Sequence, residues 1–359
     1  MIHPLVHQRL QNQRLAASSI SKPAELVAWL GAVQAQEFGP ATWAIGLRMR
    51  PGTTLDAIRK AIDDGRILRT HVLRPTWHFV AAEDIRWMLE LTGPRVLARM
   101  APYNRTLELD AKTFTRGTAV FERALAGGRY LTRNELRDAL QARGISASGT
   151  RLAHLAMYAE LEGVICSGPR RGKQSTYGLV AERAPNAIRL SPDEALARLA
   201  ERFYGSHGPA TIRDFVWWSG LMTKDARRGL DMIRAVAEEV DGVKYWSVAA
   251  TARPAGDAGP PAHLLPIYDE YLNSYRDRVL VPHSPAMSTR SVGGDAAFQH
   301  ALVVAGHVAG TWRVTTTASS TSVRVVPLRT LARAESRAIR DAAERYAAFL
   351  GTPVELSIA

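Results

Sequence analysis

The spacing of apolar residues between positions 130 and 180 predicts two helices followed by a two-stranded ribbon. Thr132 and Glu135 have the spacing of a capping box, which satisfies two free backbone N–H groups at a helix start. The second helix begins near Ser148, and a strand, a basic turn and a strand follow at 164–166, 168–174 and 176–180. This order of elements is typical of a winged helix-turn-helix module.

The same order recurs further along the chain. Thr211 to Phe215 opens a helix much as Thr132 to Leu136 does, and another helix is expected from Thr223 through Val236. Asp241-Gly242 is then a hairpin signal before the strand 243–246.

A looser copy precedes both. Its first helix is expected to start near Pro23 and to carry Leu26, Leu30 and Val33 on one face. A second helix begins at Thr54 and stops at Gly65, and strands are expected over 67–73 and 76–80. We therefore predict about three tandem winged-helix modules.

The C-terminal part has a different pattern. A Pro/Gly/Ala-rich linker is expected at 254–261, followed by a hairpin, a strand, an amphipathic helix and a last strand at 301–315, 322–328, 334–350 and 354–358. The predicted fold class is α+β, with tandem winged-helix modules and a small β-rich, barrel-like cap. The expected domains are 1–110, which carries the candidate catalytic motif, 111–190 with the basic wing, 191–253, and 254–359.

The amino-acid composition limits the classes of molecule that the protein is expected to bind. The chain has 359 residues, 46% hydrophobic content and a formal net charge of +12, which favours phosphate backbones or anionic surfaces as partners. The single cysteine, Cys166, allows neither an internal disulfide nor a Cys-based zinc site, and no HExxH spacing occurs. We expect no metal and no other cofactor. Without a signal peptide or a long apolar run, the expected location is the cytoplasm, with no membrane partner.

Five segments resemble one known family, the AlkZ-like winged-helix DNA glycosylases. The first two are short motifs with polar residues two positions apart, Val33-Gln34-Ala35-Gln36 and Thr76-Trp77-His78-Phe79. The third is the second wing, 172–177, and the last two lie in the C-terminal part, at 264–278 and 306–313. The similarity runs from about Leu26 to the C-terminus. A short Gln-apolar-Gln motif is weak by itself, whereas five segments in the same order are specific.

The resemblance implies a monofunctional enzyme that releases N7-alkylated purines from double-stranded DNA. It further implies possible unhooking of interstrand crosslinks and resistance to a DNA-alkylating natural product. Gln34, Gln36 and His78 are the catalytic candidates that it indicates, and the protein is expected to act as a monomer. A sister branch carries Asp where this chain has Gln36, so the chain groups with the branch that depends on a cationic leaving base.

A Gln amide suits that chemistry. N7 alkylation gives the purine a positive charge, so the base leaves without being protonated. The enzyme then has to hold a water molecule beside an oxocarbenium-like sugar, and an amide can orient water although it is no strong base. Gln34 and Gln36 can share one site only where the chain is extended or a helix ends beside them, because residues two apart on a helix diverge. Gly39-Pro40 suggests such a helix end.

Plainer interpretations stay open for each candidate. Gln34 and Gln36 fit a solvated helix end, and His78, in a strand between two aromatic residues, fits a hydrogen-bonded structural role. Arg170, Arg171, Lys173 and Gln174 form a basic turn that is either an ordinary solvated loop or a wing tip that contacts DNA phosphates.

Two other functions compete with base excision. A winged-helix transcription regulator would read paired half-sites as a dimer, and a non-catalytic architectural protein would only bind DNA. Cys166 and the pair Trp217-Trp218 are expected to be buried core residues that take no part in catalysis or in binding a base.

Overall fold

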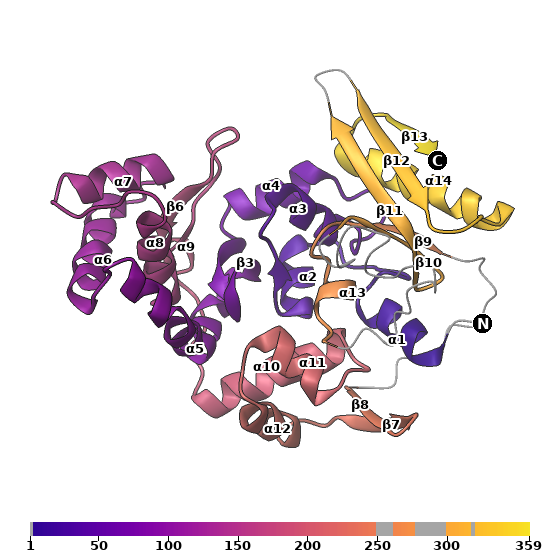
Figure 1. Cartoon of the computed structure of the whole chain (residues 1–359), viewed down its shortest axis with the longest axis horizontal. Coiled ribbons are helices and arrows are strands. Elements are labelled where there is room, and N and C mark those ends of the chain that lie inside the picture. The colour runs from indigo at the N-terminus through magenta and orange to yellow at the C-terminus, as the bar shows by residue number, and fades with distance from the viewer. Residues whose placement is uncertain (1–2, 249–260, 277–298, 317–319) are drawn as a thin grey trace.

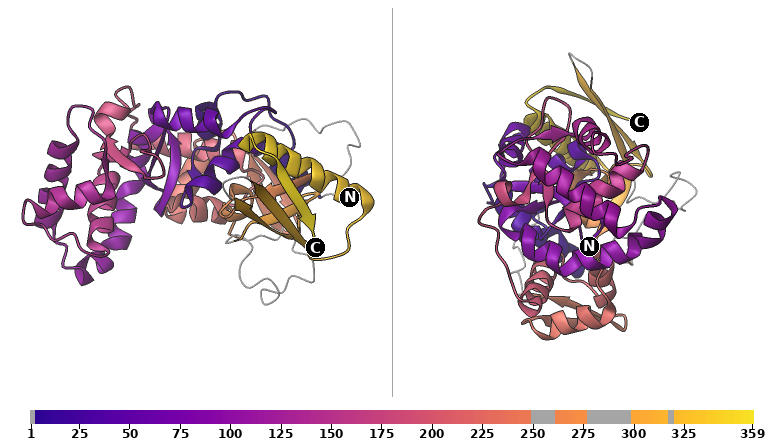
Figure 2. Two further views of the ribbon diagram at one scale, coloured as in Figure 1. Left: turned by 90° about the horizontal axis from the view of Figure 1, so that it is seen from above. Right: turned by 90° about the vertical axis from the view of Figure 1, so that its left-hand side faces the viewer.

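The computed structural model describes residues 3–248, 261–276, 299–316 and 320–359. Nearly all of the linker expected at 254–261 lies outside these ranges, as does the end of the motif at 264–278. Figure 1 shows four groups of elements, with the second winged-helix module at one end and the C-terminal sheet at the other. The left view of Figure 2 shows the same elongated arrangement from above, and the right view looks along its length with the second module in front.

The first module has the order helix, strand, helix, helix, strand, strand. Its elements are α2 (Pro23–Leu30), β1 (Val33–Gln34), α3 (Phe38–Gly46), α4 (Leu55–Asp63), β2 (Ile67–Val72) and β3 (Arg74–Ala81). The sheet order is β1-β3-β2, so the first strand pairs with the last. Thr54 caps α4 by accepting a hydrogen bond from the backbone N–H of Ala57, as its position predicts.

Two expectations for this module are wrong. Helix α2 ends at Leu30, because Gly31 takes a positive φ of 80°, and Val33 lies in strand β1 instead of on the helix face. Gly39 and Pro40 lie in the first turn of α3, where they begin a helix and do not end one. Proline is tolerated in a first helical turn because the N–H groups there have no partner in the helix.

The second module repeats the order. Its elements are α6 (Ala111–Leu125), β4 (Leu131–Thr132), α7 (Arg133–Gln141), α8 (Arg151–Leu161), β5 (Ile165–Ser167) and β6 (Thr176–Leu179), and the sheet order is β4-β6-β5. The predicted capping box is present, with both Thr132–Glu135 hydrogen bonds formed. Cys166 is fully buried in β5, as expected.

The third module has α10 (Pro192–Ser206), α11 (Ile212–Ser219), α12 (Thr223–Asp231), β7 (Val236–Val240) and β8 (Val243–Ser247). A bridge between Ala210 and Trp246 takes the place of its first strand. Helix α12 is shorter than expected, since Val236 lies in β7, whereas the hairpin at Asp241-Gly242 is confirmed. Connecting elements are α1 (Pro4–Asn12), the short helix at Ala82–Asp84, α5 (Ile85–Thr106) and α9 (Val180–Arg183).

The C-terminal part is a five-stranded sheet with one long helix. It comprises β9 (Ala262–Leu265), α13 (Glu270–Asn273), β10 (Ala301–Val304), β11 (His307–Thr316), β12 (Thr321–Pro327), α14 (Arg333–Leu350) and β13 (Val354–Ile358). The sheet order is β13-β12-β11-β10-β9, with only the β12–β13 pair parallel. The predicted hairpin, helix and last strand are all present, and the mixed α+β class is confirmed.

The hydrophobic cores show how these groups are joined. One core combines apolar residues of the first module, such as Leu26 and Phe79, with C-terminal residues such as Leu302 and Phe349. The second module has a core of its own, and the third shares one with α5 and strands β2 and β3. The division of the chain into four domains remains a proposal. The first and the last of these domains share one hydrophobic core.

The described residues contain no helix whose length and hydropathy would let it cross a bilayer.

Candidate functional site

The Gln-apolar-Gln motif lies in an extended segment. Gly31 ends α2, and the chain then runs as β1 antiparallel to β3, with Gln34 opposite His78. The backbone N–H of Ala35 continues this pairing by donating to the carbonyl of Trp77 at 2.7 Å. Strand β1 ends at Gln34, and Gln36 lies in the bend that follows. Both amide oxygens contact β3, that of Gln34 through the Arg74 side chain and that of Gln36 through the backbone N–H of Trp77.

The Gln34 side chain is held by two donors. Its exposed fraction is 8%. Its Oε1 accepts a hydrogen bond from Nη2 of Arg74 at 2.9 Å and another from Nδ2 of Asn273. Arg74 begins strand β3 and Asn273 ends α13, so two segments that are far apart in the sequence fix one amide.

Glu270 fixes the backbone at the same point. Its Oε1 accepts the N–H of Gln34 at 2.7 Å, and its Oε2 accepts from Trp218 at 3.1 Å and from Ser274 at 2.5 Å. Nε2 of His207 lies 3.4 Å from the same carboxylate. Burial alone would raise the pKa of Glu270, but the contacts with His207, Ser274 and the Gln34 N–H hold that pKa at about 2. The carboxylate is therefore a charged, buried anchor for β1.

Gln36 is held through its backbone. Arg69, on strand β2, donates from Nε to the carbonyl of Ala35 at 2.8 Å and from Nη2 to the carbonyl of Gln36 at 3.2 Å. The Arg69 guanidinium also lies 4.2 Å from the ring centre of Trp77. The Gln36 side chain is half-buried, and its Oε1 meets only the N–H of Trp77, at 3.5 Å. Its backbone is fixed while its amide keeps room to turn.

His78 lies opposite Gln34 in the pairing of β1 with β3. Its ring is fully buried, on the opposite face of β3 from its neighbours Trp77 and Phe79. Nδ1 lies 2.9 Å from the carbonyl of Thr76, and Nε2 has no hydrogen-bond partner. Burial is the main reason why the pKa of His78 falls to about 3, with the nearby Arg74 charge adding to it. The imidazole is therefore neutral at physiological pH.

The segment that carries Glu270 and Asn273 is itself locked. Asp269 caps α13 through the N–H of Tyr271 and pairs with Arg48 of the first module at 2.7 and 2.8 Å. Both side chains of that ion pair are fully buried. The Tyr271 hydroxyl donates to the carbonyl of Gly306 at 2.8 Å. Three segments that were singled out in the sequence thus meet around Gln34.

The basic wing lies beside this site. The Arg170 guanidinium lies 4.2 Å from the ring centre of Phe38, two residues after Gln36, and the Arg170 N–H donates to Asp63 at 3.0 Å. Arg171 pairs with Glu135 and also donates to the carbonyl of Tyr130, each at 2.8 Å. Lys173 and Gln174 are exposed, and within the described chain the Lys173 ammonium has no ion-pair partner.

The structure corrects the expected role of Trp217. Trp218 is fully buried, but Trp217 is 43% exposed, and its indole N–H donates to the carbonyl of Asn273 at 2.9 Å. Sequence reasoning also gave no role to Arg74, Glu270 or Asn273. Glu270 and Asn273 lie within the motif at 264–278, and charged or amide residues in that otherwise apolar run were the available signal.

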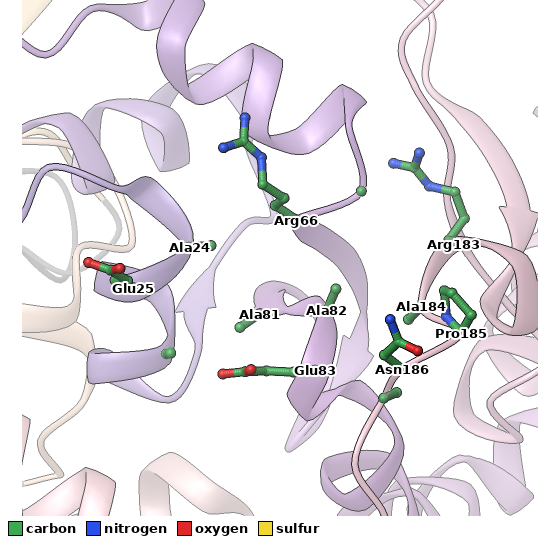
Figure 3. A pocket seen from close by; sticks show the side chains of 13 residues that line it. Ala24, Glu25, Arg66, Ala81, Ala82, Glu83, Arg183, Ala184, Pro185 and Asn186 are labelled. Carbon is green, nitrogen blue, oxygen red and sulfur yellow. The ribbon is translucent and has the colours of Figure 1, made fainter.

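A separate cleft of about 510 Å³ lies between α2, the end of β3 and the chain after α9. Figure 3 shows Arg66, Glu83 and Asn186 around it. None of Gln34, Gln36 and His78 lines this cleft, and Arg183 at its rim already donates to the carbonyls of Ile62 and Asp63. The cleft is not part of the candidate site.

Three modules of helices and short strands, with a fixed Gln34 amide and a Gln36 whose backbone is fixed, are the arrangement of a multi-domain nucleic-acid-binding protein. A family model described as DNA glycosylase AlkZ-like matches residues 27–349, so the chain belongs to the AlkZ-like DNA glycosylase family. The protein is therefore a DNA glycosylase, and DNA is its partner. Membership of an enzyme family favours base excision over the regulator and the architectural protein.

Two relatives support this assignment. A protein of Streptomyces sahachiroi named interstrand DNA cross-link repair glycosylase is 26% identical over 337 residues, which cover 85% of this chain and 86% of that protein. The structure of Streptomyces sahachiroi DNA glycosylase AlkZ matches with a TM-score of 0.80 and 22% identity, over 99% of this chain and 98% of that one. The second likeness shows a common fold.

Proposed function

We propose that this enzyme removes N7-alkylated, cationic purines from double-stranded DNA as a monofunctional glycosylase, with Gln34 and Gln36 as its catalytic residues. The observation that carries the proposal is that both amide oxygens contact strand β3, while Arg74 and Asn273 hold the Gln34 side chain and Arg69 holds the Gln36 backbone. Because a cationic base leaves without a proton donor, positioning and electrostatics supply the rate.

His78 belongs to the proposed site as a neutral residue. Its low pKa prevents it from adding a positive charge near an oxocarbenium-like sugar. Its Nε2 is enclosed and has no hydrogen-bond partner among the described residues, and His78 pairs with Gln34 across strands β3 and β1. The neutral imidazole therefore supports the Gln34 segment from within the fold and does not act as a general acid.

We propose that the DNA backbone is bound by four residues of the wing, Arg170, Arg171, Lys173 and Gln174. Their place beside Phe38 and the amide segment supports phosphate contacts next to the lesion. We further propose that the protein acts as a cytoplasmic monomer. The cross-link repair named for the Streptomyces sahachiroi relative makes crosslink unhooking, and resistance to an alkylating natural product, the related activities to test.

The test is release of free base from duplex DNA that contains 7-methylguanine. We expect release without strand cleavage, and a slowing of about 100-fold in single-turnover rate for Gln34→Ala and for Gln36→Ala, with DNA affinity nearly unchanged. A complex trapped with borohydride would contradict the monofunctional assignment. Wild-type rates in either variant would remove that glutamine from the mechanism.

Substrate range gives an independent test. Uracil is a neutral base in a stable glycosidic bond, and position 36 holds no carboxylate to act as a base. We therefore expect no uracil release under conditions that release 7-methylguanine completely. Efficient excision of uracil would show that the charge on the leaving base is not what the enzyme requires.

A further inference from the structure

The orientation of the Gln34 amide is fixed by chemistry as well as by geometry. A guanidinium group can only donate hydrogen bonds, so the Gln34 atom that faces Arg74 at 2.9 Å is its oxygen and not its nitrogen. Asn273 then has to present its NH₂ group to the same oxygen, because two amide oxygens would repel. The usual ambiguity between amide oxygen and nitrogen is absent here.

These two hydrogen bonds fill the acceptor capacity of the Gln34 side-chain oxygen. A carbonyl oxygen has two lone pairs, and in Gln34 Arg74 and Asn273 occupy both. A nucleophilic water molecule has no place left on Oε1 to which it could donate. Releasing the oxygen is costly, because the Arg74 charge and the buried Asn273 amide would lose a partner.

The nitrogen of the same amide is in the opposite situation. Within the described chain, no residue accepts a hydrogen bond from Nε2 of Gln34. Nε2 is not one of the enclosed side-chain atoms without a partner, and Gln34 is 8% exposed, so Nε2 keeps some exposure to solvent. Gln34 therefore presents two N–H donors and no acceptor.

The side-chain oxygen of Gln36 is less occupied by hydrogen bonds than that of Gln34. Its Oε1 has one contact, the Trp77 N–H at 3.5 Å, which is at the limit of a hydrogen bond. Since Arg69 holds the Gln36 backbone and not its side chain, the amide keeps an oxygen that can accept a hydrogen bond from water.

Resting on the proposed function, we propose that the two glutamines divide the work. Gln34 is a hydrogen-bond donor to an oxygen of the damaged nucleotide, and Arg74 and Asn273 are the positioning residues that hold it so. Gln36 is the acceptor that orients the attacking water. The N–H groups of Gln34 bind the nucleotide, and no covalent bond to the protein forms.

Isosteric carboxylates separate donor from acceptor. Gln34→Glu keeps the oxygen that Arg74 and Asn273 bind but replaces the donor with a second acceptor. We expect it to be as slow as Gln34→Ala, about 100-fold below wild type in single-turnover release of 7-methylguanine. Gln36→Glu, the matched control, keeps an acceptor and should be at least about ten-fold faster than Gln34→Glu. Thermal melting of both variants checks that they are folded.

The role of Asn273 is tested by a double-mutant cycle. Asn273→Ala should slow release about ten-fold in the wild type and have almost no effect in the Gln34→Ala background, because it acts through the Gln34 amide. A merely structural residue would slow both backgrounds equally, and that outcome would overturn its positioning role.

Failure of this inference is distinguishable from failure of the proposed function. If Gln34→Ala is slow and Gln34→Glu is as fast as wild type, Gln34 works as an acceptor and the division of roles is wrong, while base excision by the two amides stands. If Gln34→Ala itself has the wild-type rate, the catalytic assignment falls first. The carboxylate variants are nearly isosteric with glutamine, so the comparison remains informative even if Asn273→Ala unfolds.

Discussion

The amide segment and the basic wing are built in opposite ways. Gln34 is nearly buried and held by residues 40 and 239 positions away in the sequence. Lys173, at the tip of a local hairpin, is exposed and unpaired within the described chain. The Gln34 amide is fixed by residues that are distant in the sequence, whereas the tip of the wing is exposed to solvent.

The difference in burial between the two regions indicates which substitutions should affect stability as well as function. Charges and hydrogen bonds in the buried region act at low dielectric and are costly to leave unpaired, whereas exposed charges are screened by water and salt. Changes around the amides should therefore alter stability and rate steeply, and changes in the wing should alter DNA binding in small, additive steps.

The largest effect is expected from breaking the lock on α13. Asp269→Ala leaves the fully buried Arg48 guanidinium without its carboxylate, so the free energy of unfolding should fall by about 3–5 kcal/mol. Denaturant unfolding measures this change. Asp193→Ala breaks the exposed pair with Arg228 and serves as the control, with a loss below about 1 kcal/mol. Equal losses in both variants would mean that burial does not distinguish the two regions.

A smaller effect concerns pH and His78. Its pKa is about 3 in the folded protein, below the ordinary histidine value of 6.5, so the folded state binds fewer protons than the unfolded chain. The stability that comes from a neutral His78 is present above pH 6.5 and is lost as the pH falls from 6.5 towards 3.

His78→Gln removes this titration. Relative to wild type, the variant should lose about 2 kcal/mol less at pH 5.0 than at pH 7.5, since each pH unit below the unfolded pKa corresponds to about 1.4 kcal/mol. Denaturant unfolding at the two pH values provides the measurement, and the excision rate between pH 6 and 8 should show no titration of His78. A difference independent of pH would mean that His78 titrates normally.

The smallest effects are expected in the wing. Lys173→Ala should lower the slope of log K against log salt for duplex DNA by about 0.9, and the triple change of Arg170, Arg171 and Lys173 to Ala by up to roughly 2 to 3. Arg171 already pairs with Glu135, so its single change should contribute least. Filter binding or fluorescence anisotropy at several salt concentrations measures the slope. An unchanged slope in the triple variant would place DNA elsewhere.

Much of the fold could be predicted because its signals are local. The capping boxes at Thr132 and Thr211, the hairpin at Asp241-Gly242 and the alternation in the C-terminal strands depend on residues a few positions apart. Where a local signal was ambiguous, prediction failed: Val33 fitted the helix period, and Gly39-Pro40 fitted a helix end as well as a helix start. Pairing with β3 decided the first case, and that pairing depends on residues more than 40 positions away.

The sequence by itself determined the module order, the family resemblance and the identity of the two glutamines. Only the tertiary structure decided that both amide oxygens contact β3 and that the oxygen of Gln34 is occupied by Arg74 and Asn273. It also decided that, within the described residues, Arg171 is paired while Lys173 is not. The physical reason is that a hydrogen bond depends on the position and direction of both partners. When the chain between the partners is long, that geometry is set by the packing of the whole molecule and leaves no pattern in the local sequence.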